Sequence, residues 1–290
     1  MNRILGLILV YGSSFLSQMT GAQPYLDLFR GSFYRSPQPA AGTKEEPLNS
    51  TVWNANLTVP IPLKKGGDVV LINPFIEYNK GATGGSGFKL QSHGLMLGFL
   101  KKFDQDKMEL LVSLIGRVNK EAGHRPANRS QLGTAVLATR KMNPDLSLKA
   151  GLYFNREFFG NFFMPLAGLD WKIDGHNNLF GTLPGNLTYE HRISQRFYAG
   201  LQFRALTNSY RLPEDAAGNA YDYLRINDNQ LGLFGDVYLV KSIVCSLEIG
   251  YTIARNYRSG YQSPDLHVYT NWKSDYYYGR LTLAYRLRFR

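Results

Sequence analysis

The sequence has few of the residues on which most catalytic and metal sites depend. Its 290 residues include one cysteine and five histidines. The single cysteine, Cys245, excludes an intramolecular disulfide, and its apolar neighbours Ile243 and Leu247 indicate a small hydrophobe. Three histidines, at positions 124, 176 and 267, fall in predicted connections, so no ligand cluster is visible. The sequence therefore predicts no metal site, no cofactor and no catalytic residue.

High charge and long apolar segments are also missing. Only 19% of the residues are charged, and the mean hydropathy is −0.26. Apart from the short run Ile4–Val10, no stretch resembles a membrane helix, which needs about 20 apolar residues. The chain is thus too polar for a helical membrane protein and low in charge for a cytosolic enzyme. Membrane-spanning β-strands give this intermediate composition, because half of their residues face lipid and half face water.

The beginning of the chain has the pattern of a cleavable signal peptide. Arg3 is basic, Ile4–Val10 is a short apolar run, and Thr20–Ala22 supplies small residues before a cleavage point at Gln23. The alternative, a membrane helix, requires a much longer apolar run. We therefore expect residues 1–22 to direct export and residues 23–290 to form one domain in the outer membrane of a Gram-negative cell.

Aromatic residues and positive charge are what the sequence does have. Aromatics make up 13% of it, with 19 Tyr and 17 Phe, and both types are favoured on strands and at the membrane interfaces of barrels. The formal net charge is +11. An exported protein rarely meets nucleic acid, so we expect no such partner. The expected counterparts are membrane lipids, including anionic outer-leaflet lipid, the machinery that inserts barrels, and small solutes.

The last segment shows the clearest alternation. From Tyr277 to Phe289 the odd positions are mostly apolar or aromatic, whereas the even positions include Arg280, Arg286 and Arg288. This pattern is longer than the usual soluble strand of about 5–6 residues and fits a tilted membrane strand. A helical period fits neither this segment nor the others that share its design. These are residues 53–59, 146–155, 196–205, 231–239 and 243–252.

Short and long connections mostly alternate between the predicted strands. The short ones are 64–68, 102–106, 142–145, 174–178 and 240–242, and the long ones are 35–48, 81–87, 119–130, 208–229 and 256–274. Such sidedness is typical of an all-β, antiparallel transmembrane β-barrel. The segment Leu179–Arg192 leaves the count open, because it is either a non-spanning excursion or an extra hairpin. We expect about twelve strands, with fourteen as the alternative, since these barrels have even numbers.

Several segments resemble known barrels. The pattern Tyr277 to Phe289 resembles the last strand of outer-membrane barrels, which the insertion machinery reads, although Arg290 follows the final aromatic residue. The segments Leu169–Ile173, Leu179–Gly181 with Leu183-Pro184, and Ser209–Leu212 resemble an uncharacterised family of outer-membrane barrels from Bacteroidota. That resemblance implies a barrel over nearly the whole mature chain and adds no catalytic role.

The alternation also predicts which charged side chains face the lumen. Unpaired charges are costly in a narrow barrel, so these groups are expected to pair. One interpretation is a structural ladder that fills the lumen, and the other is an ion pathway with an arginine-lined, anion-favouring constriction. The predicted lumen residues are Arg196, Arg204, Asp236, Glu248, Arg280, Arg286 and Arg288.

The sequence therefore favours a porin-like barrel, either a passive narrow channel or a structural barrel, over two alternatives. A lipid hydrolase would need a serine beside a histidine. The pairs His191 and Ser194, and Ser92 and His93, have spacings that send the two side chains to opposite faces of a strand. An external-loop binding protein is the second alternative, motivated by the aromatic and charged segment Asn208–Asn229.

Overall fold

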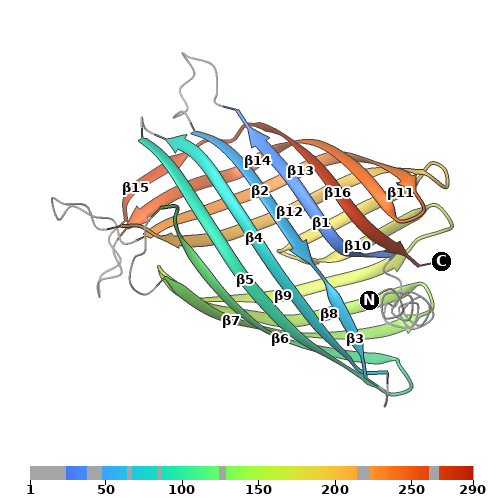
Figure 1. Ribbon diagram of the computed structural model, residues 1–290. Coiled ribbons are helices and arrows are strands. Elements are labelled where there is room, and N and C mark those ends of the chain that lie inside the picture. The colour runs from blue at the N-terminus through green and yellow to red at the C-terminus, as the bar shows by residue number, and fades with distance from the viewer. Residues whose placement is uncertain are drawn as a thin grey trace, which may run out of the picture.

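In the computed structural model the chain forms a closed antiparallel β-barrel (Figure 1). The structure describes residues 24–37, 48–63, 67–83, 86–123, 129–213, 223–260 and 268–289. These residues include no helix that is long and apolar enough to cross a membrane. The strands are β1 (Tyr25–Ser36), β2 (Leu48–Leu57), β3 (Val59–Pro62), β4 (Val69–Thr83), β5 (Ser86–Phe103), β6 (Met108–Glu121), β7 (Ser130–Asn143), β8 (Leu146–Glu157), β9 (Gly160–Lys172), β10 (Asn177–Leu183), β11 (Asn186–Arg192), β12 (Phe197–Arg211), β13 (Tyr223–Val240), β14 (Ile243–Gly260), β15 (Val268–Lys273) and β16 (Tyr277–Arg288).

The sixteen strands occupy fourteen positions around the wall. Strands β2 and β3 both pair with β4, and β15 and β16 both pair with β14, so each couple shares one position. Pairing of β1 with β16 closes the barrel. The expectation of twelve strands is wrong, and the alternative of fourteen is confirmed. Residues Leu179–Arg192, which could have been an excursion, belong to the β10–β11 hairpin.

The predicted alternation sorts side chains into an outer apolar face and an inner face. On β16, Leu281 and Leu283 are exposed, while the alternating residues Arg280 and Thr282 are buried. Outward apolar residues stay exposed all around the wall, for example Leu132, Leu152, Phe163, Leu233 and Ile249. Water-soluble proteins rarely expose so large an apolar surface, whereas the hydrocarbon core of a membrane covers it.

Two bulges reverse the alternation locally. On β1 the register with β16 shifts at Leu28, so Asp27 and Arg30 both face inward although they are three residues apart. On β14, Ala254 adopts a positive φ of 54°, and its amide and that of Arg255 donate to the Asp275 carboxylate at 2.9 and 2.7 Å. Such bulges let a strand re-aim its side chains without breaking its pairing.

The short connections lie at one end of the barrel, which we call the turn end, and so do Pro24 and Phe289, the first and last described residues (Figure 1). At this end Asp174 accepts hydrogen bonds from the His176 amide and from Asn177. These bonds hold the pKa of the Asp174 carboxyl below its ordinary value. The opposite end, which we call the loop end, corresponds to the cell exterior in barrels of this class.

Strands at the loop end extend further than predicted. The expected connection 208–229 is wrong in its bounds, because β12 continues to Arg211 and β13 begins at Tyr223. Residues 214–222, which remain of that connection, lie outside the described residues, and so do residues 1–22, for which a signal peptide is expected.

Candidate functional site

The candidate site is the lumen, and one side of it is lined by charged residues. Glu248 on β14 accepts two hydrogen bonds from Arg204 Nη1, at 2.7 and 2.8 Å. It also contacts Arg280 Nη1 at 3.2 Å and accepts a 2.6 Å hydrogen bond from the Tyr278 hydroxyl. Its carboxylate is only 3% exposed. One buried carboxylate therefore holds two guanidinium groups, and Gln230 binds one of these, Arg280, from the neighbouring strand.

A second charged cluster lies nearer the turn end. Arg286 contacts Asp27 at 2.5 Å and Asp236 at 2.6 Å, and Arg288 binds Glu190 through two hydrogen bonds of 2.9 and 2.6 Å. Aromatic rings cover the two arginines, because Arg286 lies 3.6 Å above the Tyr25 ring and Arg288 lies 3.7 Å above the Tyr198 ring. Bidentate pairing and stacking on aromatic rings are the contacts for which arginine is better suited than lysine.

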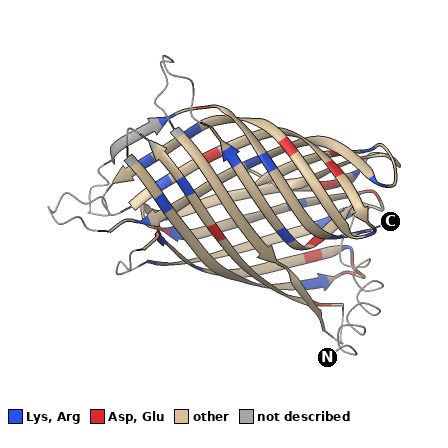
Figure 2. Ribbon diagram, turned by 45° about the horizontal axis from the view of Figure 1, so that its top comes forward, with Lys and Arg blue, Asp and Glu red and all other residues tan. Residues whose placement is uncertain are grey.

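One of the predicted lumen side chains lies apart from the others. Arg196 is exposed in the β11–β12 turn, where the alternation has ended. The structure brings the other six inside the barrel: Arg204, Asp236, Glu248, Arg280, Arg286 and Arg288. We call these six, with Asp27 and Glu190, the charged wall. Figure 2 shows how basic and acidic positions are distributed over the strands.

Asp27 and Glu190 were not predicted. Simple alternation cannot find Asp27, because the Leu28 bulge changes the face on which it lies. Glu190 lies on β11, in the segment whose strand character was left open. A surplus of predicted inward arginines over carboxylates was the one signal that further acidic partners were needed.

On the opposite side of the lumen, formed by β5 to β9, an apolar band lies between two sets of inward ion pairs. Lys141–Glu109 and Lys149–Asp170 lie toward the turn end, and Arg117–Glu157 lies toward the loop end. Exposed outward residues such as Leu97, Leu114 and Phe163 fix the orientation of these strands, so the residues next to them face inward. The inward apolar residues are Met96, Leu111, Ile115, Ala135, Leu137, Tyr153, Met164 and Leu166. We call this set the apolar wall. All of its members keep intermediate solvent exposure, so the lumen is open beside them, whereas the charged wall is largely buried.

At the loop end the lumen is closed by a hydrophobic core. This core comprises Phe88, Leu90, Tyr210, Leu224, Ile226 and Tyr257. The Tyr210 hydroxyl donates a 2.6 Å hydrogen bond to Glu77. A cavity of about 50 Å³ lies beside this core, lined by residues that include Asn79, Asp228 and Arg280. A space of that size holds a few water molecules and offers no straight path for a larger solute.

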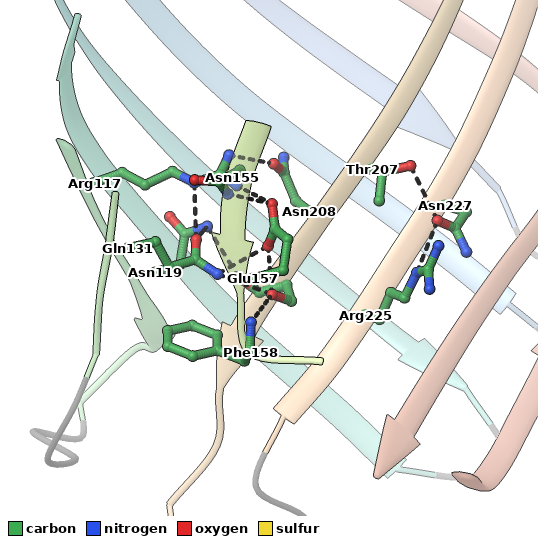
Figure 3. Close-up of polar contacts among 11 residues, drawn as sticks. Arg117, Asn119, Gln131, Asn155, Glu157, Phe158, Thr207, Asn208, Arg225 and Asn227 are labelled. Atoms are coloured by element: carbon green, nitrogen blue, oxygen red, sulfur yellow. Dashed lines mark hydrogen bonds and ion pairs between the residues drawn. The ribbon is translucent and has the colours of Figure 1, made fainter. Parts of the chain in front are cut away.

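A polar cluster joins strands that are not neighbours in the wall (Figure 3). Glu157 on β8 pairs with Arg117 and accepts hydrogen bonds from Gln131 at 2.9 Å and from the Ser209 hydroxyl at 2.6 Å. Ser209, on β12, also accepts a 3.0 Å hydrogen bond from the Phe158 amide. We call this the Glu157 cluster, which comprises Arg117, Asn119, Gln131, Asn155, Glu157 and Ser209. It fixes the loop end of β12 against the inner face of β6, β7 and β8, and β12 pairs with β6 at Arg211 and Lys120.

The two serine–histidine pairs do not form a catalytic arrangement. His191 Nδ1 is 2.8 Å from the Asn177 side chain, and the Ser194 hydroxyl accepts from the amides of residues 196 and 197. Ser92 is buried, whereas His93 next to it is exposed. Among the described residues there is also no group of histidine, cysteine and acidic side chains that could hold a metal ion.

Comparisons with known proteins agree with this architecture. The first similar structure is an outer membrane channel from Pseudomonas putida F1, with 8% identity, a TM-score of 0.50 and coverage of 91% of this chain and 96% of that chain. The NanC porin has 10% identity, a TM-score of 0.38 and coverage of 89% and 98%. At such identities the likeness shows the fold alone. No curated protein matches the sequence.

The family model described as "Domain of unknown function (DUF6268)" matches residues 90–281. The matched region includes strands β6 to β15 and most of both lumen walls. The fold and the apolar outer face define an outer-membrane β-barrel. The chain is thus an outer-membrane barrel that belongs to the DUF6268 family.

Proposed function

We propose that this barrel is a passive channel with a narrow lumen that favours anions. The observation that carries the proposal is the difference between the two walls: the apolar wall leaves the lumen open, and the charged wall beside it is rich in arginine. Glu248 is shared by Arg204 and Arg280, and Asp27 is shared by Arg30 and Arg286. Together with Arg30, the charged wall has five guanidinium groups and four carboxylates, so it keeps one excess positive charge, which favours anions.

The hydrophobic core at the loop end limits this function. Because the core closes the straight path, we expect a small conductance and an entry route that avoids the barrel axis. A structural barrel without transport is the second candidate, and the buried charged wall and the closed loop end support it. An enzyme is disfavoured by the separation of His191 from Ser194 and of Ser92 from His93.

The proposal is tested by single-channel recording of the refolded, heat-modifiable barrel in a planar bilayer under a potassium chloride gradient. We expect discrete conductance and a reversal potential on the anion-selective side. Arg204→Gln should shift the reversal potential toward zero, whereas Arg196→Gln, at an exposed turn position, should leave it unchanged. A folded barrel that carries no current would contradict the channel and favour the structural barrel.

We also propose how the barrel is exported and which partners it meets. Export through a signal peptide at residues 1–22 accounts for how a barrel reaches the outer membrane. Anionic outer-leaflet lipid and the insertion machinery are the proposed partners, together with small solutes. A source among the Bacteroidota stays a prediction from the segments around Leu169 and Leu179.

A further inference from the structure

The wall of the barrel contains one unusually short hairpin. Strands β10 and β11 have seven residues each, whereas their neighbours β9 and β12 have 13 and 15. Seven residues at about 3.3 Å per residue and a tilt of about 40° rise roughly 18 Å. The apolar band of an outer-membrane barrel is about 25 Å tall. The hairpin therefore ends within the depth of the membrane.

Above the hairpin the hydrogen-bonded wall is interrupted. Strand β9 pairs with β10 only from Ala167 to Lys172, and β12 pairs with β11 only from Tyr198 to Arg204. One further bond joins the Ala205 amide to the Gly185 carbonyl at 2.9 Å. Above the hairpin tip, residues 160–166 of β9 and residues 206–210 of β12 pair with no strand of the described chain along the edges that β9 and β12 turn toward each other.

This interruption lies at lipid depth. Phe163, on the outer face of β9 beside it, is 70% exposed, and Leu152 on the neighbouring strand is 63% exposed. Unpaired backbone is costly in contact with hydrocarbon and is tolerated where it lines a polar or water-containing space. At its base the interruption is about 14 Å wide, since two strands separate β9 from β12 there at a spacing of about 4.8 Å.

Polar contacts hold the upper border of the interruption in place (Figure 3). The Glu157 cluster binds β12 to the β8–β9 turn, and the Arg225 guanidinium lies 4.0 Å above the Phe159 ring of that turn. Below this border, Thr207 donates a 3.1 Å hydrogen bond to Asn227 on the next strand. The border therefore consists of fixed polar groups facing an apolar band, as at the boundary between lipid headgroups and hydrocarbon.

On the lumen side, residues of both the apolar wall and the charged wall border the interruption. Met164 and Leu166 of the apolar wall lie on β9, and Arg204 of the charged wall lies on β12, paired in register with Asn186 at the tip of the hairpin. The hydrophobic core blocks the axial route at the loop end. A molecule in the lumen thus has an apolar surface on one side, guanidinium groups on the other and membrane beside it.

We infer that the interruption between β9 and β12 is a side opening through which the lumen takes up a single-chain amphiphile with an anionic head group from the outer leaflet. The chain lies along Met164 and Leu166, and the head group lies toward Arg204. This inference rests on the proposed channel function, because it names the route and the substrate class of the same lumen. It differs from passage of a water-soluble anion along the barrel axis.

The test uses pyrene-labelled hexadecanoate as the probe and the full barrel in phosphatidylcholine vesicles, with binding followed by tryptophan-to-pyrene energy transfer. Met164→Tyr narrows the lumen side of the opening, and Thr207→Tyr fills its outer side. Each should weaken binding at least tenfold. Leu152→Tyr, on the lipid-facing side of β8, is the matched control and should bind within twofold of the wild type. Heat-modifiability on gels establishes that each variant is folded.

A second set of measurements distinguishes the contribution of the head group to binding from that of the chain. It also distinguishes the side opening from the channel function. Replacing the probe by pyrene-labelled hexadecanol should weaken binding in the wild type about tenfold, and Arg204→Gln should remove that preference. Conductance in a planar bilayer without probe binding would overturn the side opening and leave the channel standing. Equal binding by the wild type, Met164→Tyr and Thr207→Tyr would also overturn it. Loss of both binding and conductance in the folded wild type would refute the channel function as well.

Discussion

The two walls of the lumen follow the same alternation but use their inward positions differently. The charged wall uses long side chains, and residues such as Glu248 and Arg286 are almost completely buried. The apolar wall uses shorter or flexible side chains, such as Ala135, Leu137 and Met164, which keep contact with solvent. Midway along the barrel, the interior is therefore filled on one side and open on the other, although no separate domain enters it within the described residues.

This difference shows how one barrel combines rigidity with space. Buried ion pairs hold each strand in a single register, because a shift would leave charges unpaired. Apolar side chains facing water contribute little stability but leave room for a solute. We therefore expect substitutions in the charged wall to change stability and substitutions in the apolar wall to change conductance.

The largest expected effect comes from breaking the charged wall at its centre. Glu248→Gln removes the carboxylate that holds Arg204 and Arg280. Breaking a buried pair by changing one partner costs about 3–5 kcal/mol. Unfolding by guanidinium chloride in detergent or vesicles measures the loss. Asp106→Asn, whose carboxylate lies half exposed at the turn end, is the control and should cost less than about 1 kcal/mol. Equal stability of the two variants would contradict the structural role of the charged wall.

The Glu157 cluster should show an intermediate effect on stability and a clear effect on conductance. Ser209→Ala removes the hydroxyl that donates to Glu157 and accepts from the Phe158 amide. Leaving buried polar groups unsatisfied costs about 1–3 kcal/mol. Because the cluster fixes β12 across the loop end, its loss should also increase conductance in bilayer recordings. A stable variant with unchanged current would show that the cluster does not hold the loop end closed.

Substitutions in the apolar wall should affect conductance more than stability. Ala135→Phe places a ring in the open part of the lumen and should reduce single-channel conductance severalfold. The stability cost should stay below about 1 kcal/mol, since overpacking is costly only where the site is already filled. Ala284→Phe is the matched variant on the buried side, because Ala284 is 1% exposed. It should destabilise the barrel by about 1–3 kcal/mol. Similar stability losses in both variants would remove the distinction between the walls.

The smallest effect is expected outside both walls, at the turn end. Hydrogen bonds from His176 and Asn177 lower the pKa of Asp174, so its ionised form stabilises the folded state. This contribution is present above the ordinary carboxyl pKa and is lost as the pH falls through the lowered value. Asp174→Asn should therefore be slightly less stable than the wild type at neutral pH, and the difference should vanish in acid. Thermal unfolding at several pH values would detect it, and a difference that grows in acid would contradict this assignment.

Alternation was sufficient to predict the class of fold and the inward orientation of several charged side chains. Strict period-two patterns such as Tyr277 to Phe289 specify both the strand and the face of each residue, so Arg280 and Arg286 could be placed inside from the sequence. The count failed at Leu179–Arg192, because two seven-residue strands show too few alternating positions to be told from a loop.

The remaining errors have local or long-range causes. The bulge at Leu28 depends on pairing with β16, nearly the whole chain away, so the position of Asp27 could not be read from its own segment. Arg196 follows the alternation of β12 but lies in the turn before it. The contact between Glu157 and Ser209 joins residues 52 positions apart on strands that are not neighbours, and no periodic pattern predicts such a contact.

The pairing of β6 with β12 also sets the shape of the barrel. Fourteen strand positions surround the lumen at the turn end, but the contact between Lys120 and Arg211 leaves only nine inside the smaller ring at the loop end, because β7 to β11 lie outside it. An eight-stranded barrel has an interior just wide enough for its own side chains. The barrel thus tapers toward the loop end, to a width at which the residues of the hydrophobic core can fill its interior.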